Sequence, residues 1–157
     1  MHVLIAVFIT LLAFSSSLFA AQGFVRVKSA HDVKSTADRL QQVLESEDMI
    51  VFARIDHALG AKAVGTTLRP TELVIFGNPA IGSKLMQCNQ SIAIDLPQKA
   101  LIFEDEAGQV WLAYNEPEYL AKRHNLRGCG KVLQKVTGAL DKFATAATKQ
   151  DEKSDNY

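Results

Sequence analysis

The spacing of apolar residues divides most of the chain into predicted strands and helices. Residues 24–28 alternate apolar and polar side chains, which is the two-residue period of a strand. The next segment repeats apolar residues at helical spacing and predicts a helix. Its apolar positions are Val33, Ala37, Leu40, Val43 and Leu44. Ser29 and Asp32 are three residues apart, and we expect them to open this helix as a capping box.

The remaining segments complete one α+β domain. Strands are predicted over residues 49–57, 71–77, 99–104 and 110–114, with a small-residue loop over 58–65. Short helices are expected over 80–86 and 117–124, and a longer last helix carries one apolar stripe. The stripe comprises Val132, Val136, Leu140, Phe143 and Ala147. This order of elements predicts an antiparallel sheet with helices mainly on one face.

The predicted strands are apolar on both faces. Val74 and Phe76 lie on the opposite side of their strand from Leu73 and Ile75, because alternate residues face opposite ways. The predicted hairpin is also apolar on both faces. One face carries Leu101, Phe103 and Trp111, and the other carries Ile102, Val110, Leu112 and Tyr114. Helices on one side cover one face only, so the second face must meet a partner subunit, a ligand or the chain's own loops. We expect a homodimer, with a ligand groove as the alternative.

The first residues have the layout of a secretory signal peptide. An apolar run over 3–14 is followed by serines and by Ala20 and Ala21, where cleavage is expected. We therefore expect a signal peptide over 1–20, one domain over 24–148, and a disordered tail over 149–157. No Lys or Arg precedes the apolar run, so an uncleaved anchor is the alternative. A periplasmic or secreted location is expected, with no membrane contact after cleavage.

The charge balance argues against one class of partner, and the length indicates a single domain. The chain has 17 basic and 17 acidic residues and a pI near 6.9, without the basic stripe of nucleic-acid-binding proteins. We expect no nucleic-acid partner. The mature chain of about 135 residues has the length of one domain.

Two cysteines, Cys88 and Cys129, remain after the expected cleavage. An exported protein retains disulfides, and the even number favours a pair. Such a bond would close a loop of about 40 residues, worth about 3–4 kcal/mol in the chain-entropy model. Two separate buried thiols are the alternative, since the distance between them is not fixed by the sequence.

Several polar residues are candidates for chemistry. His57, next to Asp56 at a strand end, is a candidate general base or ligand, although a histidine that caps a turn explains it as well. Glu104, with the acidic residues after it at a hairpin tip, is a candidate carboxylate, although turns favour such residues on their own.

Two further groups are candidates for binding. Asn78 begins a predicted short helix whose N-terminus attracts anions, with Lys84 nearby. Tyr114 is a candidate for a pocket mouth, although packing is the commoner use of such a tyrosine. A soft metal would suit Met86, Cys88 and Cys129, with His57 and His124. These residues lack the tight spacing of metal ligands, so we expect no metal and no cofactor.

Three segments resemble a known family. They are R-P-T-E-L-V-I-F-G-N-P, I-D-L-P-Q-K-A-L-I-F-E-D and V-W-L-A-Y-N-E-P-E-Y-L-A-K-R-H-N-L. Together they resemble the domain-of-unknown-function family 302. The resemblance implies a compact, dimer-forming domain with no established reaction. It also implies a curved sheet of the TATA-binding-protein-like or helix-grip type. Cys88, Cys129 and the signal peptide indicate an exported variant.

Three hypotheses about function follow. The first is a non-catalytic binding module whose second sheet face takes a partner or a small apolar ligand. The second is a hydrolase- or isomerase-like enzyme that uses His57 with a carboxylate such as Glu104. The third is a periplasmic metal-handling protein that uses Met86, Cys88 and Cys129. The chain has no nucleophile elbow, phosphate loop or dinucleotide fingerprint, so the sequence leaves catalysis undecided.

Overall fold

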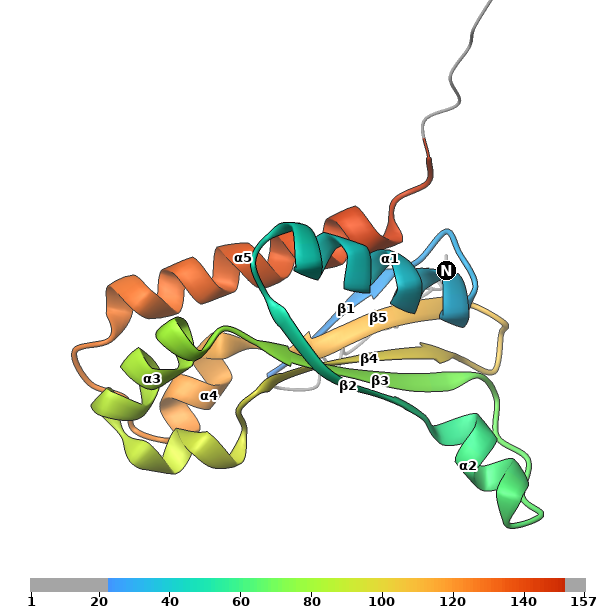
Figure 1. The fold of residues 1–157 in the computed structure, drawn as a ribbon, viewed down its shortest axis with the longest axis horizontal. Helices are drawn as coiled ribbons and strands as arrows, with labels where there is room; N and C mark the ends of the chain where they lie inside the picture. The colour runs from blue at the N-terminus through green and yellow to red at the C-terminus, as the bar shows by residue number, and fades with distance from the viewer. Residues whose placement is uncertain (1–22, 152–157) are drawn as a thin grey trace, which may run out of the picture.

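The computed structural model describes residues 23–151, which fold into one antiparallel sheet with helices on one side and at the sheet ends (Figure 1). The five strands lie in the order β1-β5-β4-β3-β2. Their bounds are Phe24–Lys28 for β1, Ile50–Asp56 for β2, Thr71–Gly77 for β3, Gln98–Glu104 for β4 and Val110–Asn115 for β5. The prediction of an α+β fold with an antiparallel sheet is confirmed.

Two helices, α1 (Val33–Ser46) and α5 (Gly130–Thr148), lie side by side over one face of the twisted sheet (Figure 1). The strand side chains beneath them form the core with the apolar stripes of both helices. The largest fully buried members are Phe76, Leu40, Leu44, Ile92, Ile102, Leu112, Leu120 and Val74. The stripe predicted for the last helix is therefore confirmed as its core-facing side, with Val132 partly buried at the margin.

The start of α1 differs from the expected capping box. Asp32 is the N-cap, and its carboxylate accepts a hydrogen bond of 2.6 Å from the backbone N–H of Ser35. Ser29 is buried instead, with its hydroxyl 2.7 Å from the hydroxyl of Thr36. The prediction of Ser29 as the cap was wrong. The Asp32 carboxylate already accepts from an N–H of the first turn, and the Ser29 hydroxyl bonds to Thr36 instead.

The segment predicted as a small-residue loop over 58–65 is also different, since it contains the helix α2 (His57–Ala63). Asp56 caps this helix by accepting a hydrogen bond of 2.8 Å from the N–H of Leu59. Ala, Leu and Lys are good helix formers, and with this cap they outweigh the single Gly60. The helix projects away from the rest of the domain (Figure 1), and Leu59 and Val64 are exposed.

The other end of the sheet carries α3 (Pro79–Cys88), the 3-10 helix η1 (Gln90–Ile94) and α4 (Pro117–Arg123). Proline in the first turn opens both α3 and α4. Asn125, with φ 49°, ends α4 in the left-handed conformation that helix C-termini favour. The sequence did not predict η1.

The buried carboxylate of Glu72, on the helix-covered face of the sheet, has an ion-pair partner. Glu72 of β3 is buried beneath α1, and the Nε of Arg54 lies 2.5 Å from its carboxylate. The same guanidinium lies 2.7 Å from Asp38 of α1. Glu72 raises the pKa of Arg54, and Lys34 and Arg54 lower the pKa of Asp38. The ion pairs thus connect α1 to the edge of the sheet.

The predicted signal peptide lies outside the described residues, as does most of the predicted tail. Residues 149–151 are anchored to the domain. The ring of His31 donates to the carbonyl of Lys149 at 2.9 Å, and Arg39 lies 2.9 Å from Asp151. Within residues 23–151, none of the helices combines the length and apolarity needed to cross a bilayer.

Candidate ligand pocket

A largely apolar cavity of about 370 Å³ lies between α3, α5 and the end of the sheet where β3 stops and β4 starts. We call it the α3–α5 pocket. Phe76 and Gln98, which pair across β3 and β4, form its floor. The apolar walls are Ile81, Gly82, Leu85 and Met86 of α3, then Ala93, Leu96 and Pro97, and finally Val136, Ala139, Leu140 and Phe143 of α5. This composition suits the apolar body of a small ligand.

A β-bulge places an aromatic ring at the pocket mouth. The register between β2 and β3 shifts between Val51 and Ala53, which leaves Phe52 as the extra residue. Phe52 lines the pocket, and it is 51% exposed. The bulge thus turns a side chain of the edge strand toward the cavity, at the point where the cavity meets solvent.

Three polar residues contribute to the pocket lining, and only Asn78 is hydrogen-bonded within the fold. Asn78 caps α3 by accepting from the N–H of Ala80 at 2.9 Å, and it donates to the carbonyl of Asp48 at 3.3 Å. Lys135 of α5 is exposed at the rim. The side-chain amide of Gln98 has no hydrogen-bond partner within residues 23–151, and its atoms remain in reach of solvent although the residue as a whole is only 8% exposed. Its donor and acceptor are available to a ligand.

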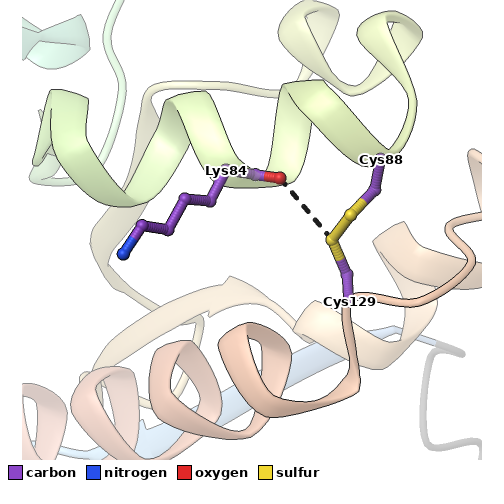
Figure 2. Close-up of a disulfide and its surroundings, with 3 residues drawn as sticks. All are labelled: Lys84, Cys88 and Cys129. Atoms are coloured by element: carbon purple, nitrogen blue, oxygen red, sulfur yellow. Dashed lines mark hydrogen bonds between the residues drawn. A yellow bond between two sulfur atoms is a disulfide. The ribbon is translucent and has the colours of Figure 1, made fainter.

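A disulfide holds the α3 side of the pocket. Cys88, the last residue of α3, is bonded to Cys129, the residue before α5 (Figure 2). Their Cα atoms are 6.3 Å apart and they are 41 residues apart in sequence. The predicted disulfide is therefore present in the structure. The Cys129 sulfur also lies 3.6 Å from the carbonyl oxygen of Lys84, a packing contact because a disulfide sulfur carries no hydrogen.

A second tie, which we call the His124 clamp, joins η1 to the end of α4. The buried ring of His124 lies 2.5 Å from the Asp95 carboxylate through Nε2 and 2.9 Å from the Ser91 hydroxyl through Nδ1. If Nε2 carries the proton and donates to Asp95, then Nδ1 accepts from Ser91. The side chain of Asn89 donates to the His124 carbonyl at 2.7 Å. The clamp fixes the segment that supplies Ala93, Leu96 and Pro97 to the pocket.

The His124 clamp has the order of groups found in a serine hydrolase triad. Ser91 and His124 line neither the α3–α5 pocket nor a second cavity, which lies between α4 and the start of α5. The Ser91 N–H is bonded to the Asn89 side chain at 3.0 Å, so it is not available to stabilise an oxyanion. We therefore assign the clamp a structural role.

The sheet face opposite the helices, which we call the open face, is apolar as predicted. It carries Ile55, Leu73, Ile75, Leu101, Phe103 and Trp111. Arg26 and Lys28 of β1 lie over the Trp111 ring, 5.3 and 5.6 Å from its centroid. The indole N–H donates to Asp105 at 2.8 Å, and this bond lowers the pKa of the Asp105 carboxyl together with backbone N–H groups of the same turn.

The catalytic candidates lie at one end of the sheet, where β2 and β4 stop on either side of β3. His57 is the exposed first residue of α2, Asp56 is its cap, and Glu104 ends β4. Within the described residues, no hydrogen bond or ion pair joins His57 to Glu104. The pair proposed for catalysis is thus not assembled in this structure.

Only some of the candidate binding residues line the α3–α5 pocket. Asn78 and Met86 line the α3–α5 pocket, whereas Lys84 is exposed and lies outside it. Tyr114 is buried in the core rather than at a mouth, and burial raises the pKa of its hydroxyl. Gln98 and Lys135 were missed, because a residue's place beside a cavity depends on elements far apart in sequence.

Two of the three residues proposed as metal ligands are engaged in the disulfide. Because Cys88 and Cys129 are bonded to each other, neither sulfur is a thiolate. The structure of residues 23–151 also has no group of three or more His, Cys, Asp or Glu side chains able to hold a metal ion.

The chain belongs to the family described as "Domain of unknown function DUF302", whose model matches residues 25–143. A solved structure of an uncharacterized conserved DUF302 protein from Bacillus stearothermophilus superposes with a TM-score of 0.72 at 16% identity. That likeness covers 79% of this chain and 97% of the other. It shows a shared fold.

Two relatives are more similar in sequence. Both are called "Fluoride-specific ion channel FluC 1", from Brucella suis biovar 1 (strain 1330) and Brucella abortus biovar 1 (strain 9-941). Each is 46% identical over 126 residues, which is 78% of this chain. The match covers 50% and 47% of these relatives, so the chain spans about half their length.

Proposed function

We propose that the protein is an exported, non-catalytic binding module that takes a small apolar ligand in the α3–α5 pocket. The observation that carries the proposal is the cavity itself, about 370 Å³ with almost entirely apolar walls. Small-molecule sites occupy roughly 300–1,000 Å³, so the pocket suits a ligand at the small end of that range.

The two ties around the pocket support this function. A site that is already formed loses less conformational entropy when a ligand binds. The disulfide fixes α3 to the start of α5, and the His124 clamp fixes the segment after η1. The walls therefore come from elements that are tied to each other rather than from free loops.

A neutral fluorescent probe, N-phenyl-1-naphthylamine, tests the proposal directly. We expect saturable binding of one probe per chain, abolished by Gly82→Leu. A Cβ at Gly82 would make ordinary van der Waals contact, 3.9 Å from Leu96 Cδ1, and the rest of a leucine side chain would take up space in the pocket that Gly82 lines. The matched control is Gly138→Leu on α5, where a Cβ meets nothing within 4 Å and which does not line the pocket. Absence of binding, or equal binding to both variants, would reject the pocket.

We also propose that the open face pairs two copies of the chain. An apolar sheet face is a self-complementary surface that closes by two-fold symmetry. Light scattering coupled to size exclusion should give a dimer mass, and Leu101→Asp should give a monomer. Leu59→Asp on the projecting α2 is the control and should stay dimeric. A monomeric parent protein, or a dimer that survives Leu101→Asp, contradicts this interface.

Export is the third part of the proposal. The amino-terminal apolar run and the Cys88–Cys129 bond both suit an oxidising compartment. Mass spectrometry of the protein from the exported fraction should give a chain that begins near residue 21 and is two hydrogens lighter than its reduced form. A full-length chain with free thiols in the cytosolic fraction would contradict export.

A second candidate function comes from the Brucella relatives. A match at 46% identity to half of a protein named as a fluoride channel favours a module that serves such a channel. We propose this as the alternative biological setting. Cells that lack this chain should then become sensitive to fluoride and recover when it is restored. Unchanged fluoride tolerance would remove this setting and leave the pocket proposal intact.

A further inference from the structure

We propose that the ligand of the α3–α5 pocket is an amphiphilic carboxylate, with an apolar chain of medium length and one anionic head group. The inference rests on the proposed function and specifies the class of ligand. It is carried by the juxtaposition of an amide without a protein partner on the pocket floor, a cation at the rim and otherwise apolar walls.

Gln98 supplies the first part of the argument. The side-chain amide of Gln98 lies on the floor of the cavity, where solvent reaches it in the free protein. Within residues 23–151 this amide has no protein hydrogen-bond partner. A ligand that fills the cavity displaces the solvent and must offer the amide a polar atom in exchange. A purely hydrocarbon ligand would leave this amide unpaired and bury it further.

Charge supplies the second part. Lys135 is the charged residue of the pocket lining, and Asp and Glu do not occur in that lining. Gln98, the first residue of β4, and Lys135, in the early turns of α5, line the same cavity. A carboxylate accepts from the amide N–H₂ and is attracted by the ammonium group. An alkylammonium head would be repelled.

The volume and the walls supply the third part. The walls offer aliphatic and aromatic side chains from α3, α5 and the bulge residue Phe52. The one further polar side chain of the lining, Asn78, is already engaged with Ala80 and Asp48, so it does not pair with a second head. Each buried methylene adds about fourfold to affinity until the cavity is full. Affinity should therefore rise with chain length and then level off, in a way that reports the length of the cavity.

The test uses the intact oxidised protein loaded with N-phenyl-1-naphthylamine. Displacement is measured with decanoate, decanol and decylammonium at equal concentrations below micelle formation. We expect decanoate to compete best, decanol about tenfold less well and decylammonium least. A series from hexanoate to tetradecanoate should show the fourfold steps and the plateau.

Two substitutions with matched controls assign the head-group contacts. Gln98→Leu should weaken decanoate at least tenfold relative to the neutral probe, because a hydrogen bond to a charged group is lost. Gln134→Leu, on the part of α5 outside the pocket, should change neither. Lys135→Gln should weaken decanoate up to about fivefold, and less at high salt. Lys131→Gln is its control.

The outcomes separate the two proposals. If the probe does not bind, or binds equally well to Gly82→Leu, the pocket proposal itself fails. If the probe binds in the pocket and the three head groups compete equally, the pocket stands and the carboxylate inference is overturned. Decanoate affinity unchanged by Gln98→Leu would overturn it as well.

Discussion

The domain has two apolar surfaces, on opposite sides of one sheet. They differ in shape and in whether their polar groups already have partners. The α3–α5 pocket is concave, has an unpaired amide on its floor, and is enclosed by elements tied through a disulfide and the His124 clamp. The open face is a broad strand surface whose polar contacts, Arg26 and Lys28 on Trp111 and Asp105 on the indole, are already satisfied. Apolarity alone therefore does not identify a ligand site. On the basis of shape and unused polar groups, we propose the pocket for the small molecule and the open face for a second subunit.

The largest expected effect is on the pocket side, where Cys88→Ser with Cys129→Ser removes the disulfide. A bond that closes a loop over 41 residues of separation contributes about 4 kcal/mol in the chain-entropy model. Urea unfolding should show a loss of that size, and affinity for N-phenyl-1-naphthylamine should fall because α3 is released. The dimer mass should stay the same. If probe affinity is unaffected, the disulfide does not shape the pocket.

The next effect is expected from the His124 clamp. His124→Ala leaves the Asp95 carboxylate poorly exposed and without its main partner, which should cost about 2–3 kcal/mol of unfolding free energy. Ser91→Ala removes only the exposed end of the clamp and should cost about 1 kcal/mol. Urea unfolding of both variants checks the ranking. An esterase activity abolished by Ser91→Ala without loss of stability would instead make the clamp catalytic.

A smaller effect should separate the open face from the pocket. Leu101→Asp places a charge at the centre of the apolar strand rows and should shift the protein from dimer to monomer. Its effect on the unfolding free energy of the monomer should stay below about 2 kcal/mol, because Leu101 is only partly buried there. Binding of the neutral probe should not change. Coupled loss of the dimer and of probe binding would mean that both surfaces form one site.

The smallest effect concerns pH and the open face. The hydrogen bond from Trp111, with backbone N–H groups, holds the pKa of Asp105 below its usual value of 3.8. Because the folded pKa is the lower one, the contribution to stability is complete above pH 3.8 and is lost as the pH falls through the folded pKa. Trp111 fluorescence should therefore titrate below pH 3.8, and Asp105→Asn should abolish that transition. A fluorescence transition that persists in Asp105→Asn would assign it to another group.

The contrast between the two sides also shows what the sequence could predict. The alternation in β3, β4 and β5 predicted both apolar faces correctly, because a strand's period is a local property. The stripes of α1 and α5 were predicted for the same reason. The helix α2 was missed because Gly60 and the small residues around it resemble a loop, whereas the cap from Asp56 decides the structure.

The pocket was beyond sequence reasoning. Its lining comes from β2, β3, α3, the segment after η1, β4 and α5, and the sequence does not give their spacing. In the sequence, Gln98 is an ordinary polar residue at the start of a strand. Its proposed role in ligand binding depends on its place beside the cavity and on its lack of a partner among the described residues. Asp95 and His124 are 29 residues apart, and no motif joins them. Asn78 was predicted as a binding residue for its helix N-terminus, and it lines the pocket while capping that helix.

The central claim is that a small amphiphile enters the α3–α5 pocket and leaves the open face untouched. Both methionines within residues 23–151, Met49 and Met86, line the pocket, and the single tryptophan, Trp111, lies on the open face. One NMR titration with decanoate, on protein labelled at the methionine methyl groups and the indole nitrogen, therefore reports on both surfaces. We expect the Met49 and Met86 methyl signals to shift and saturate together while the Trp111 indole signal stays in place. A shift of Trp111 with unmoved methionine signals would contradict the account.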